Sequence, residues 1–163
     1  MNQVKRLQSK ILSVTALESK LEKWRSENEK IVFTNGCFDL LHLGHVDYLA
    51  KARDLGDRLV VGLNSDTSIK HIKGSSRPIN DEQSRLALLA GMSYVDAVVL
   101  FNEDTPINLI SAVMPDVLVK GGDYTIKEIV GHEIVLNNAG EVCTIDFVEG
   151  YSSSALIEKI KAS

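Results

Sequence analysis

The sequence has little of what marks secreted or membrane proteins. Its 163 residues include two cysteines, Cys37 and Cys143, far apart in the chain, so a disulfide-built scaffold is excluded. No apolar run approaches the roughly 20 residues that span a bilayer, and no apolar leader precedes the first charges. We therefore expect a cytoplasmic protein with reduced thiols and no membrane contact.

An excess of positive charge is also missing. Lysine and arginine number 18 against 22 acidic residues, for a formal net charge of −4, and the basic residues are scattered. Proteins that bind long nucleic acids concentrate basic residues on one face, so a nucleic-acid partner is excluded. With 44% hydrophobic and 25% charged residues, the composition is typical of one globular domain with a single core.

Short apolar stretches alternate with helical patterns along the chain. The stretches rich in β-branched residues predict five strands, at 31–36, 58–64, 96–101, 116–120 and 142–148. Between them the sequence predicts a polar loop at 65–78 and helices at 43–55, from a cap at Asn80, from Thr105-Pro106 to near Met114, at 127–138 and at 153–162. This order predicts a single α/β domain with a doubly wound, five-stranded parallel sheet.

The N-terminal segment has a pattern of its own. Thr15 followed by Glu18 has the form of a capping box. Apolar side chains then recur at helical spacing beside charged ones: Val14, Leu17, Leu21 and Trp24. We expect an amphipathic helical arm over residues 1–29, followed by the main domain over 30–163.

Glycine, serine and lysine cluster in the segments that follow the predicted strands. Glycine admits close backbone approach, helix N-termini present free amides, and lysine or arginine supplies positive charge, all of which suit phosphate. Ligands of such sheets bind beyond the carboxyl ends of the strands. The chain lacks the Gly-x-Gly-x-x-Gly fingerprint, and the run KGSS at 73–76 lacks the earlier glycine of a Walker A loop. A phosphorylated ligand in a different kind of site is therefore predicted.

Two histidines stand where the helix at 43–55 begins. His42 and His45 are three residues apart, so both rings can face one side, and Gly44 between them leaves space for an anion. We interpret them first as phosphate contacts. Two alternatives stay open, which are ordinary capping or surface histidines and a zinc site with Cys37 or Asp39.

The same stretch resembles a known superfamily. The run HLGH at 42–45 resembles the His-x-Gly-His motif of nucleotidyltransferases, and GCFD at 36–39 resembles the motif of their cytidylyltransferase-like branch. Within that branch, VLVKGGDY at 117–124 and IVG at 129–131 resemble the adenylyltransferases of ADP-heptose synthesis. The resemblance implies a Rossmann-like domain that transfers AMP from ATP to D-glycero-D-manno-heptose 1-phosphate, giving ADP-heptose and pyrophosphate.

The resemblance also implies roles for individual residues. The catalytic candidates are His42, His45, Lys73 and Arg77, the last two in a loop that we expect to close over phosphates. The candidates for nucleotide binding are Thr34, Asn35, Gly36, Cys37, Phe38, Gly44, Arg85, Ser152, Ser153 and Ser154. The candidates for substrate binding are Asp39, Lys120, Gly121, Gly122 and Asp123. Asp39 has a second reading as the residue that fixes its own loop, Arg85 as a surface residue, and the serines as plain helix caps.

The implied reaction needs Mg²⁺ with ATP, held largely by phosphates and water, so we expect no metal-ligating residues in the protein. A separate sugar kinase would supply the sugar phosphate, and the resemblance implies a homo-oligomer. The alternative enzyme is a cytidylyltransferase acting on glycerol 3-phosphate, although Ser93 stands where relatives that use cytidine nucleotides often have arginine. The alternative from another class is a non-catalytic nucleotide-binding module.

Overall fold

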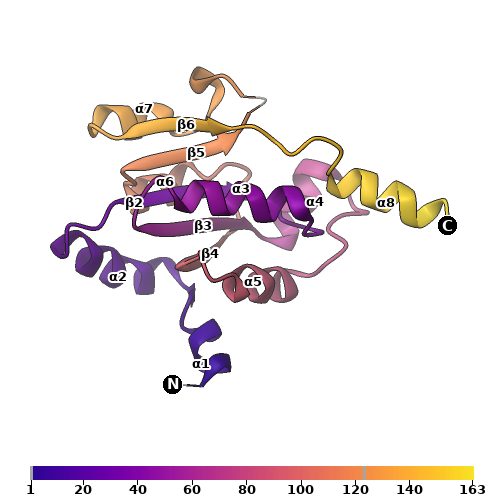
Figure 1. Cartoon of the computed structure of the whole chain (residues 1–163), viewed down its shortest axis with the longest axis horizontal. Helices are drawn as coiled ribbons and strands as arrows, with labels where there is room; N and C mark the ends of the chain where they lie inside the picture. The colour runs from indigo at the N-terminus through magenta and orange to yellow at the C-terminus, as the bar shows by residue number, and fades with distance from the viewer. Residues whose placement is uncertain (1, 123) are drawn as a thin grey trace.

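A parallel sheet forms the centre of the structure, a computed structural model that describes residues 2–122 and 124–163 (Figure 1). Its strands lie in the order β1-β4-β3-β2-β5-β6, and every neighbouring pair is parallel. The strands are β1 (Ile11–Leu12), β2 (Ile31–Gly36), β3 (Arg58–Asn64), β4 (Ala97–Phe101), β5 (Val117–Gly121) and β6 (Glu141–Ile145).

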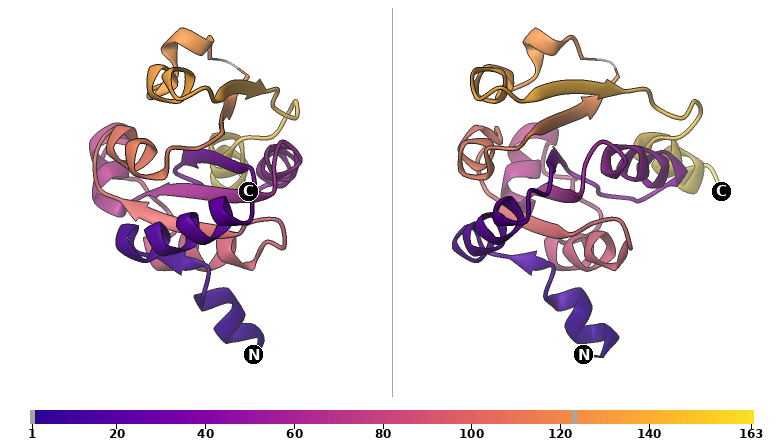
Figure 2. Two further views of the ribbon diagram at one scale, coloured as in Figure 1. Left: turned by 90° about the vertical axis from the view of Figure 1, so that its left-hand side faces the viewer. Right: turned by 60° about the vertical axis from the view of Figure 1, so that its left-hand side comes forward.

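Helices connect the strands and cover both faces of the sheet (Figure 2). They are α1 (Gln3–Gln8), α2 (Val14–Ser26), α3 (Leu43–Arg53), α4 (Asp66–Lys73), α5 (Glu82–Gly91), α6 (Ile107–Val113), the 3₁₀ turn η1 (Ile126–Glu128), α7 (His132–Asn137) and α8 (Ser153–Lys161). The last helix, α8, extends away from the sheet, so the two chain ends lie far apart (Figure 1).

Alternation along the strands divides the core into two layers. Ile31 and Phe33 of β2 pack with buried residues of α2, α6 and α7. Val32, between them, packs with buried residues of α3 and α5 on the other face. Successive side chains of a strand point to opposite faces, so strands covered by helices on both sides are apolar throughout. This explains the nearly continuous apolar runs of the sequence.

The five predicted strands are confirmed, but the predicted count was wrong by one. Ile11 and Leu12 form β1, which pairs with Val98 and Val99 of β4 at the edge of the sheet. A strand of two residues is too short for alternation to reveal. The strand predicted to reach residue 148 ends at Ile145, which leaves the following apolar residues outside the sheet.

The helices differ from the prediction mainly at their ends. Residues predicted as a polar loop form α4, which Ser65 caps by accepting a hydrogen bond from the Ser68 amide. The cap of α5 is Asp81 rather than Asn80. The helix predicted at 127–138 is divided into η1 and α7 because Gly131 takes the left-handed conformation, with φ of 85°.

Helix α2, the longer of the two helices in the N-terminal segment, packs into the main core. Leu17, Leu21 and Trp24 of α2 are 1%, 2% and 7% exposed and share one apolar cluster with Phe33. The cap of α2 is Ser13, not Thr15. The chain therefore places this segment against the sheet, and the boundary at residue 29 stays a prediction that we take up below.

The order of the strands determines where a ligand can enter. From β2 in the middle, the chain adds β3 and β4 on one side and then crosses to β5 and β6 on the other. The strand order therefore reverses between β2 and β5. The loops that follow these two strands diverge at their carboxyl ends, which is where doubly wound sheets form their binding crevice.

Candidate active site

A cleft of about 500 Å³ opens at this reversal point. The loops after β2 and β5, the end of α4 and the segment between β6 and α8 contribute its walls. The site residues predicted from the sequence that line it are Asn35, Gly36, Cys37, Phe38, Asp39, His42, Gly44, His45, Lys73, Arg77, Lys120, Gly121, Ser152, Ser153 and Ser154. One cavity thus collects residues that the sequence spreads over more than a hundred positions.

The loop after β2 turns tightly under the cleft. Phe38 takes a left-handed backbone conformation with φ of 44°, which is rare for a bulky residue and persists only where the surroundings hold it. Its ring fills the space beside Gly36, where a Cβ atom would lie 3.0 Å from Phe38 Cε2. The same ring lies 5.2 Å from the His45 ring, centroid to centroid. Phe38 therefore supports both the turn and one of the two histidines.

His42 and His45 stack on each other at the floor of the cleft, with ring centroids 3.8 Å apart and planes inclined by 23°. Within the described residues, Nδ1 of each ring is buried and has no hydrogen-bond partner. Gly44 makes the arrangement possible, because a Cβ atom there would lie 3.0 Å from His42 Nδ1. The two imidazole rings therefore line the cleft side by side, with their Nδ1 atoms turned away from solvent.

Burial controls the protonation of these rings. Burial lowers the pKa of His42. The pKa of His45 falls to about 4, first because of burial and then because of the nearby charges of His42 and Lys73. Both rings are therefore neutral at pH 7 in the unliganded protein. A bound anion would stabilise their protonated forms and raise both pKa values.

Two helix N-termini meet at the cleft. His42 is the N-cap of α3 and makes no side-chain cap hydrogen bond within the described chain, so amides of the first turn stay available. Ser152 caps α8 by accepting from the Ala155 amide, and Ser153 Oγ donates to the Leu40 carbonyl at 3.0 Å. Helix N-termini carry partial positive charge and bind anions. Ser152 thus serves as a cap, and Ser153 brings α8 to the loop that carries the histidines.

Asp39 holds the other wall of the cleft in place. Its carboxylate, in a residue only 2% exposed, accepts hydrogen bonds from Arg77 Nε at 2.7 Å and from the amides of Ile79 and Asn80 at 2.8 and 2.9 Å. Burial works to raise the pKa of Asp39, but these hydrogen bonds outweigh it and lower the pKa. The geometry fits the loop-fixing reading of Asp39, and the predicted substrate contact stays a prediction.

Two lysines approach the cleft from opposite sides. Lys73 is the last residue of α4, and its side chain is exposed at the cleft margin. Lys120 Nζ lies 3.4 Å from the Asn35 carbonyl oxygen and 5.8 Å from the Tyr124 ring centroid. Together with Arg77 they supply the positive charge that a polyphosphate requires.

Three predicted site residues do not line the cleft. Thr34 is buried and its Oγ1 is hydrogen-bonded to Tyr48 OH at 2.7 Å. Gly122 packs against Asp146, and Arg85 is completely buried below the cleft. A fourth residue, Asp123, lies outside the described residues.

The cleft also contains residues that the sequence patterns did not single out. They are Tyr48, Phe147, Val148, Glu149, Gly150 and Tyr151, and Tyr124, the last residue of the motif VLVKGGDY, lines the cleft as well. Most belong to the segment between β6 and α8, where Phe147 and Tyr151 are 58% and 47% exposed. The sequence feature that could have identified this segment is its aromatic residues in a glycine-containing stretch after a strand. It was missed because the predicted strand ran to residue 148 instead of ending at Ile145.

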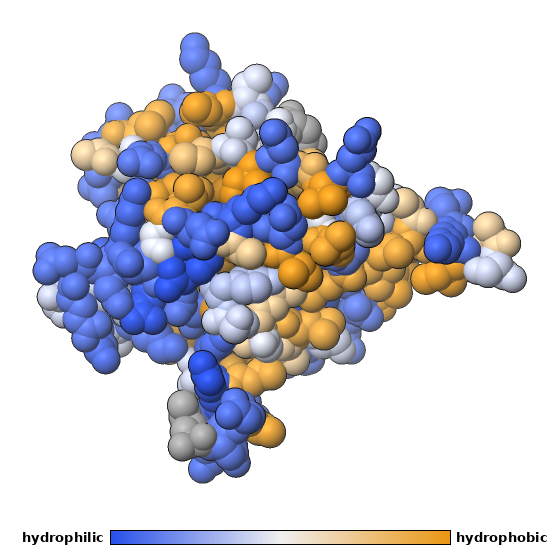
Figure 3. Space-filling view, viewed as in Figure 1, coloured by the Kyte–Doolittle hydropathy of each residue, from blue (hydrophilic) through white to orange (hydrophobic). Residues whose placement is uncertain are grey.

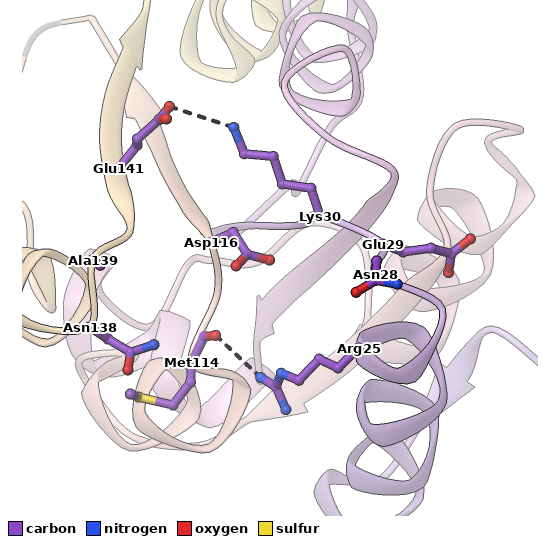
Figure 4. A pocket seen from close by; sticks show the side chains of 9 residues that line it. All are labelled: Arg25, Asn28, Glu29, Lys30, Met114, Asp116, Asn138, Ala139 and Glu141. Atoms are coloured by element: carbon purple, nitrogen blue, oxygen red, sulfur yellow. Dashed lines mark hydrogen bonds and ion pairs between the residues drawn. The ribbon is translucent and has the colours of Figure 1, made fainter.

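A larger hollow, of about 650 Å³, lies at the other end of the strands, near the amino ends of β2, β5 and β6 (Figure 4). Its charged groups already have partners within the protein. Arg25 donates to the Val113 and Met114 carbonyls, Lys30 pairs with Glu141 at 3.6 Å, and Asp116 accepts from the Ile31 amide. We therefore assign the functional site to the smaller cleft, where two stacked histidines and two helix N-termini converge.

No group of three or more His, Cys, Asp or Glu side chains in the described part of the chain is arranged to hold a metal ion. The zinc alternative for His42 and His45 is therefore unsupported, since the Asp39 carboxylate is engaged by Arg77 and two amides. Nor does any described helix combine the length and apolarity that crossing a bilayer requires.

Comparison with known proteins agrees with this geometry. The chain is 59% identical over 148 residues to the "Bifunctional protein HldE" of Helicobacter pylori strain J99, covering 91% of this chain and 31% of that protein. It is 56% identical over 152 residues to the protein of the same name from Campylobacter concisus, covering 93% and 31%. The chain thus spans about a third of the length of these relatives.

Solved structures give the same fold. A lipopolysaccharide core biosynthesis protein from Thermoplasma volcanium matches with a TM-score of 0.59 and 32% identity, over 76% of this chain and 99% of that one. Pantoate-beta-alanine ligase from Francisella tularensis, at 14% identity and a TM-score of 0.58 over 94% and 79% of the chains, shares the fold alone. The cytidylyltransferase-like family matches residues 33–159. The chain therefore belongs to the cytidylyltransferase-like family of nucleotidyltransferases.

Proposed function

We propose that this chain transfers AMP from ATP to D-glycero-D-manno-heptose 1-phosphate, giving ADP-heptose and pyrophosphate. The observation that carries the proposal is the stacked pair His42 and His45, which lines the cleft where two helix N-termini converge. The choice of heptose is supported by the motifs VLVKGGDY and IVG, which resemble the adenylyltransferases of ADP-heptose synthesis, and the chain is 56–59% identical to the bifunctional HldE relatives. The product would supply activated heptose for surface polysaccharide.

In this reaction a phosphate oxygen of the sugar 1-phosphate attacks the α-phosphorus of ATP. A new P–O bond forms, the bond to the β-phosphate breaks, and pyrophosphate leaves in line. The step needs alignment and charge neutralisation rather than a covalent nucleophile. His42 and His45 would bind the triphosphate with the amides of α3, and Lys73 and Arg77 would bind phosphate oxygens from the other wall.

Mg²⁺ fits this site as a companion of ATP. Magnesium prefers oxygen ligands and keeps several waters, whereas the cleft floor offers imidazole nitrogen and the Asp39 carboxylate is already hydrogen-bonded. Triphosphate oxygens would therefore supply most of its ligands. The bound ion would neutralise the triphosphate and stabilise the leaving pyrophosphate.

The proposal also includes an upstream enzyme, a cell compartment and an oligomeric state. A separate kinase activity would supply the sugar phosphate, and the reaction would take place in the cytoplasm. The predicted homo-oligomer is supported by exposed apolar side chains, among them Leu43 and Val46 of α3, which are 51% and 41% exposed, and by the apolar patches on the face that Figure 3 shows. Exposed apolar clusters of this kind commonly mark contacts between protein chains.

The test is pyrophosphate release by the purified chain with Mg²⁺, crossing ATP and CTP against both anomers of heptose 1-phosphate and glycerol 3-phosphate. We expect release with ATP and one heptose anomer. His45→Gln should lower this turnover about a hundredfold or more, whereas His71→Gln, on the exposed side of α4, should leave it unchanged. Release with CTP and glycerol 3-phosphate would instead identify a cytidylyltransferase, and ATP binding without any release would identify a binding module.

A further inference from the structure

Arg85 is the largest side chain that the described part of the chain buries completely. A guanidinium group removed from water needs hydrogen-bond acceptors for its donors. Arg85 finds four: Nε donates to the Asn80 carbonyl at 3.1 Å, Nη1 to the Cys37 and Asn64 carbonyls at 2.8 and 2.7 Å, and Nη2 to Asp66 Oδ1 at 2.7 Å. These acceptors come from three separate loops.

Each of these loops leads into the cleft. Cys37 belongs to the loop after β2, which continues to Asp39 and His42. Asn64 ends β3, and Asp66 begins α4, the helix that carries Lys73 at its far end. The third loop, before α5, contains Asn80. The backbone amide of Asn80 donates to the Asp39 carboxylate, which also accepts a hydrogen bond from Arg77. A single buried group thus touches the base of both cleft walls.

A second contact supports the same connection. The Asp66 amide donates to Glu82 Oε2 at 2.9 Å, while the Asp66 carboxylate accepts from Arg85. Glu82 and Arg85 lie one turn apart on α5, so this helix holds the first residue of α4 through both its amide and its carboxylate. The orientation of α4, and with it the place of Lys73, depends on these two contacts.

We propose that Arg85 is a positioning residue for nucleotidyl transfer, which fixes the histidine loop and the Lys73–Arg77 wall relative to each other without touching the substrate. Arg85 is completely buried, four of its five N–H donors are bonded within the protein, and it is not among the residues that line the cleft. The planar guanidinium suits this role because it reaches several acceptors in fixed directions, whereas a lysine ammonium acts as a point charge. The kinetic part of this proposal rests on the proposed function, and the structural part does not.

The first test compares Arg85→Lys with a matched control, Arg58→Lys. Arg58 is also held by several charged hydrogen bonds, to Glu29 and Asp96, but it lies at the amino end of β3, away from the cleft. A displacement of about 1 Å at a catalytic group costs up to a hundredfold in rate. We expect Arg85→Lys to lower kcat at least about tenfold with little change in KM for ATP, and Arg58→Lys to leave kcat within about twofold. Equal kcat values for the two variants would overturn the proposal, as would a rise in KM for ATP with kcat unchanged, which indicates a phosphate ligand.

The second test uses the protein without nucleotide, so it does not depend on the reaction. Amide hydrogen exchange reports local opening, and the amides of Ile79 and Asn80 are bound to Asp39 in the loop that Arg85 holds. We expect these two amides to exchange at least about tenfold faster in Arg85→Lys than in Arg58→Lys. Equal exchange would contradict the proposal even if no acceptor is found for the wild-type enzyme.

Asp66→Asn provides a milder variant if Arg85→Lys does not fold. It keeps Arg85 and removes the charge of its one carboxylate partner, at a side chain that is 30% exposed. We expect the same direction of change in kcat and in the exchange of the Ile79 and Asn80 amides, with a smaller size. An unchanged kcat together with unchanged exchange would overturn the proposal.

Discussion

The two histidines at the start of α3 combine burial with a proposed role that needs positive charge. Their rings lie 3.8 Å apart, and burial lowers the pKa of both, to about 4 for His45. A triphosphate between two helix N-termini would reverse this balance, because an anion favours the protonated rings. The unliganded site is therefore neutral at its floor and gains charge only when the ligand arrives.

This balance predicts how stability depends on pH. A histidine whose pKa is about 4 in the folded protein and about 6.5 in the unfolded chain binds more protons when unfolded, so stability rises with pH between these values. Its contribution is fully present above about pH 6.5 and is lost as the pH falls toward 4. The free energy of unfolding of the wild type should therefore fall between pH 7 and pH 5. In His45→Gln this fall should be smaller by about 1 kcal/mol, a value that allows for partial exposure of the ring.

Urea denaturation of the unliganded protein at several pH values measures this difference. The variant should run parallel to the wild type above pH 7, which serves as the internal control, and the acid effect of Asp39 is common to both proteins and cancels. Parallel curves down to pH 5 would show that His45 is protonated in the folded protein.

At the residue scale, the sequence predicted the location of residues that are close together in the chain. His42, Gly44 and His45 lie together in the cleft because three-residue spacing at a helix start leaves little freedom. Arg85 could not be predicted in the same way. Four residues from the cap of α5, it has the pattern of a surface arginine, and its acceptors come from loops up to 48 residues away. Only the folded chain shows that it is buried.

At the element scale, the end of β5 and the segment after β6 depend on one close contact. A Cβ atom on Gly121 would lie 2.1 Å from Phe147 Cζ, so the aromatic ring covers the glycine directly. Phe147 lines the cleft and is 58% exposed. The glycine that ends β5 therefore determines where this ring lies in the cleft.

Gly121→Ala should separate binding from stability. The exposed Phe147 ring can move away from the new methyl group, so we expect the free energy of unfolding to change by less than about 1 kcal/mol. The displaced ring should weaken ATP binding about five- to tenfold, which corresponds to loss of one aromatic contact of ~1 kcal/mol. Titration calorimetry with ATP and urea denaturation measure the two quantities.

Two further variants control this result. Gly62→Ala places its Cβ 2.9 Å from Phe33 Cζ and 3.0 Å from Leu109 Cδ2 inside the core, so it should lose about 1–3 kcal/mol of stability. In a Phe147→Ala background, Gly121→Ala should have no further effect on ATP binding, because the clash is gone. A persisting effect there would exclude Phe147 as its cause.

Element ends show where sequence patterns lose information. The five longer strands were predictable because apolar runs covered on both faces leave few alternatives. The helix α4 could not be predicted in this way. Only Ile69 among its apolar residues is buried, and its remaining residues have the composition of a loop. The break between η1 and α7 depends on the backbone of Gly131, whose Cβ position is occupied by Ile110 of a distant helix.

At the scale of the whole molecule, the N-terminal segment takes part in the same core as the catalytic domain. Strand β1 extends the sheet beside β4, and α2 buries Leu17, Leu21 and Trp24 against the face that α6 covers. The sequence predicted the apolar stripe of this helix but not its partner, because a stripe shows that a face is buried without showing against what. Whether residues 1–29 act as a separate arm therefore depends on whether they unfold together with the sheet or independently of it.

Leu21→Ala answers this question. Leu21 is 2% exposed, so its truncation should cost about 2–5 kcal/mol, whereas Val14→Ala on the same helix, at a side chain 40% exposed, should cost about 0.5 kcal/mol or less. Trp24 is the single tryptophan of the chain, so its fluorescence reports on α2 while far-ultraviolet circular dichroism reports on the whole fold. If the segment and the sheet form one cooperative unit, both signals shift together to lower urea in Leu21→Ala. A fluorescence transition that shifts alone, with the dichroism midpoint unchanged, would show that residues 1–29 are an independent arm.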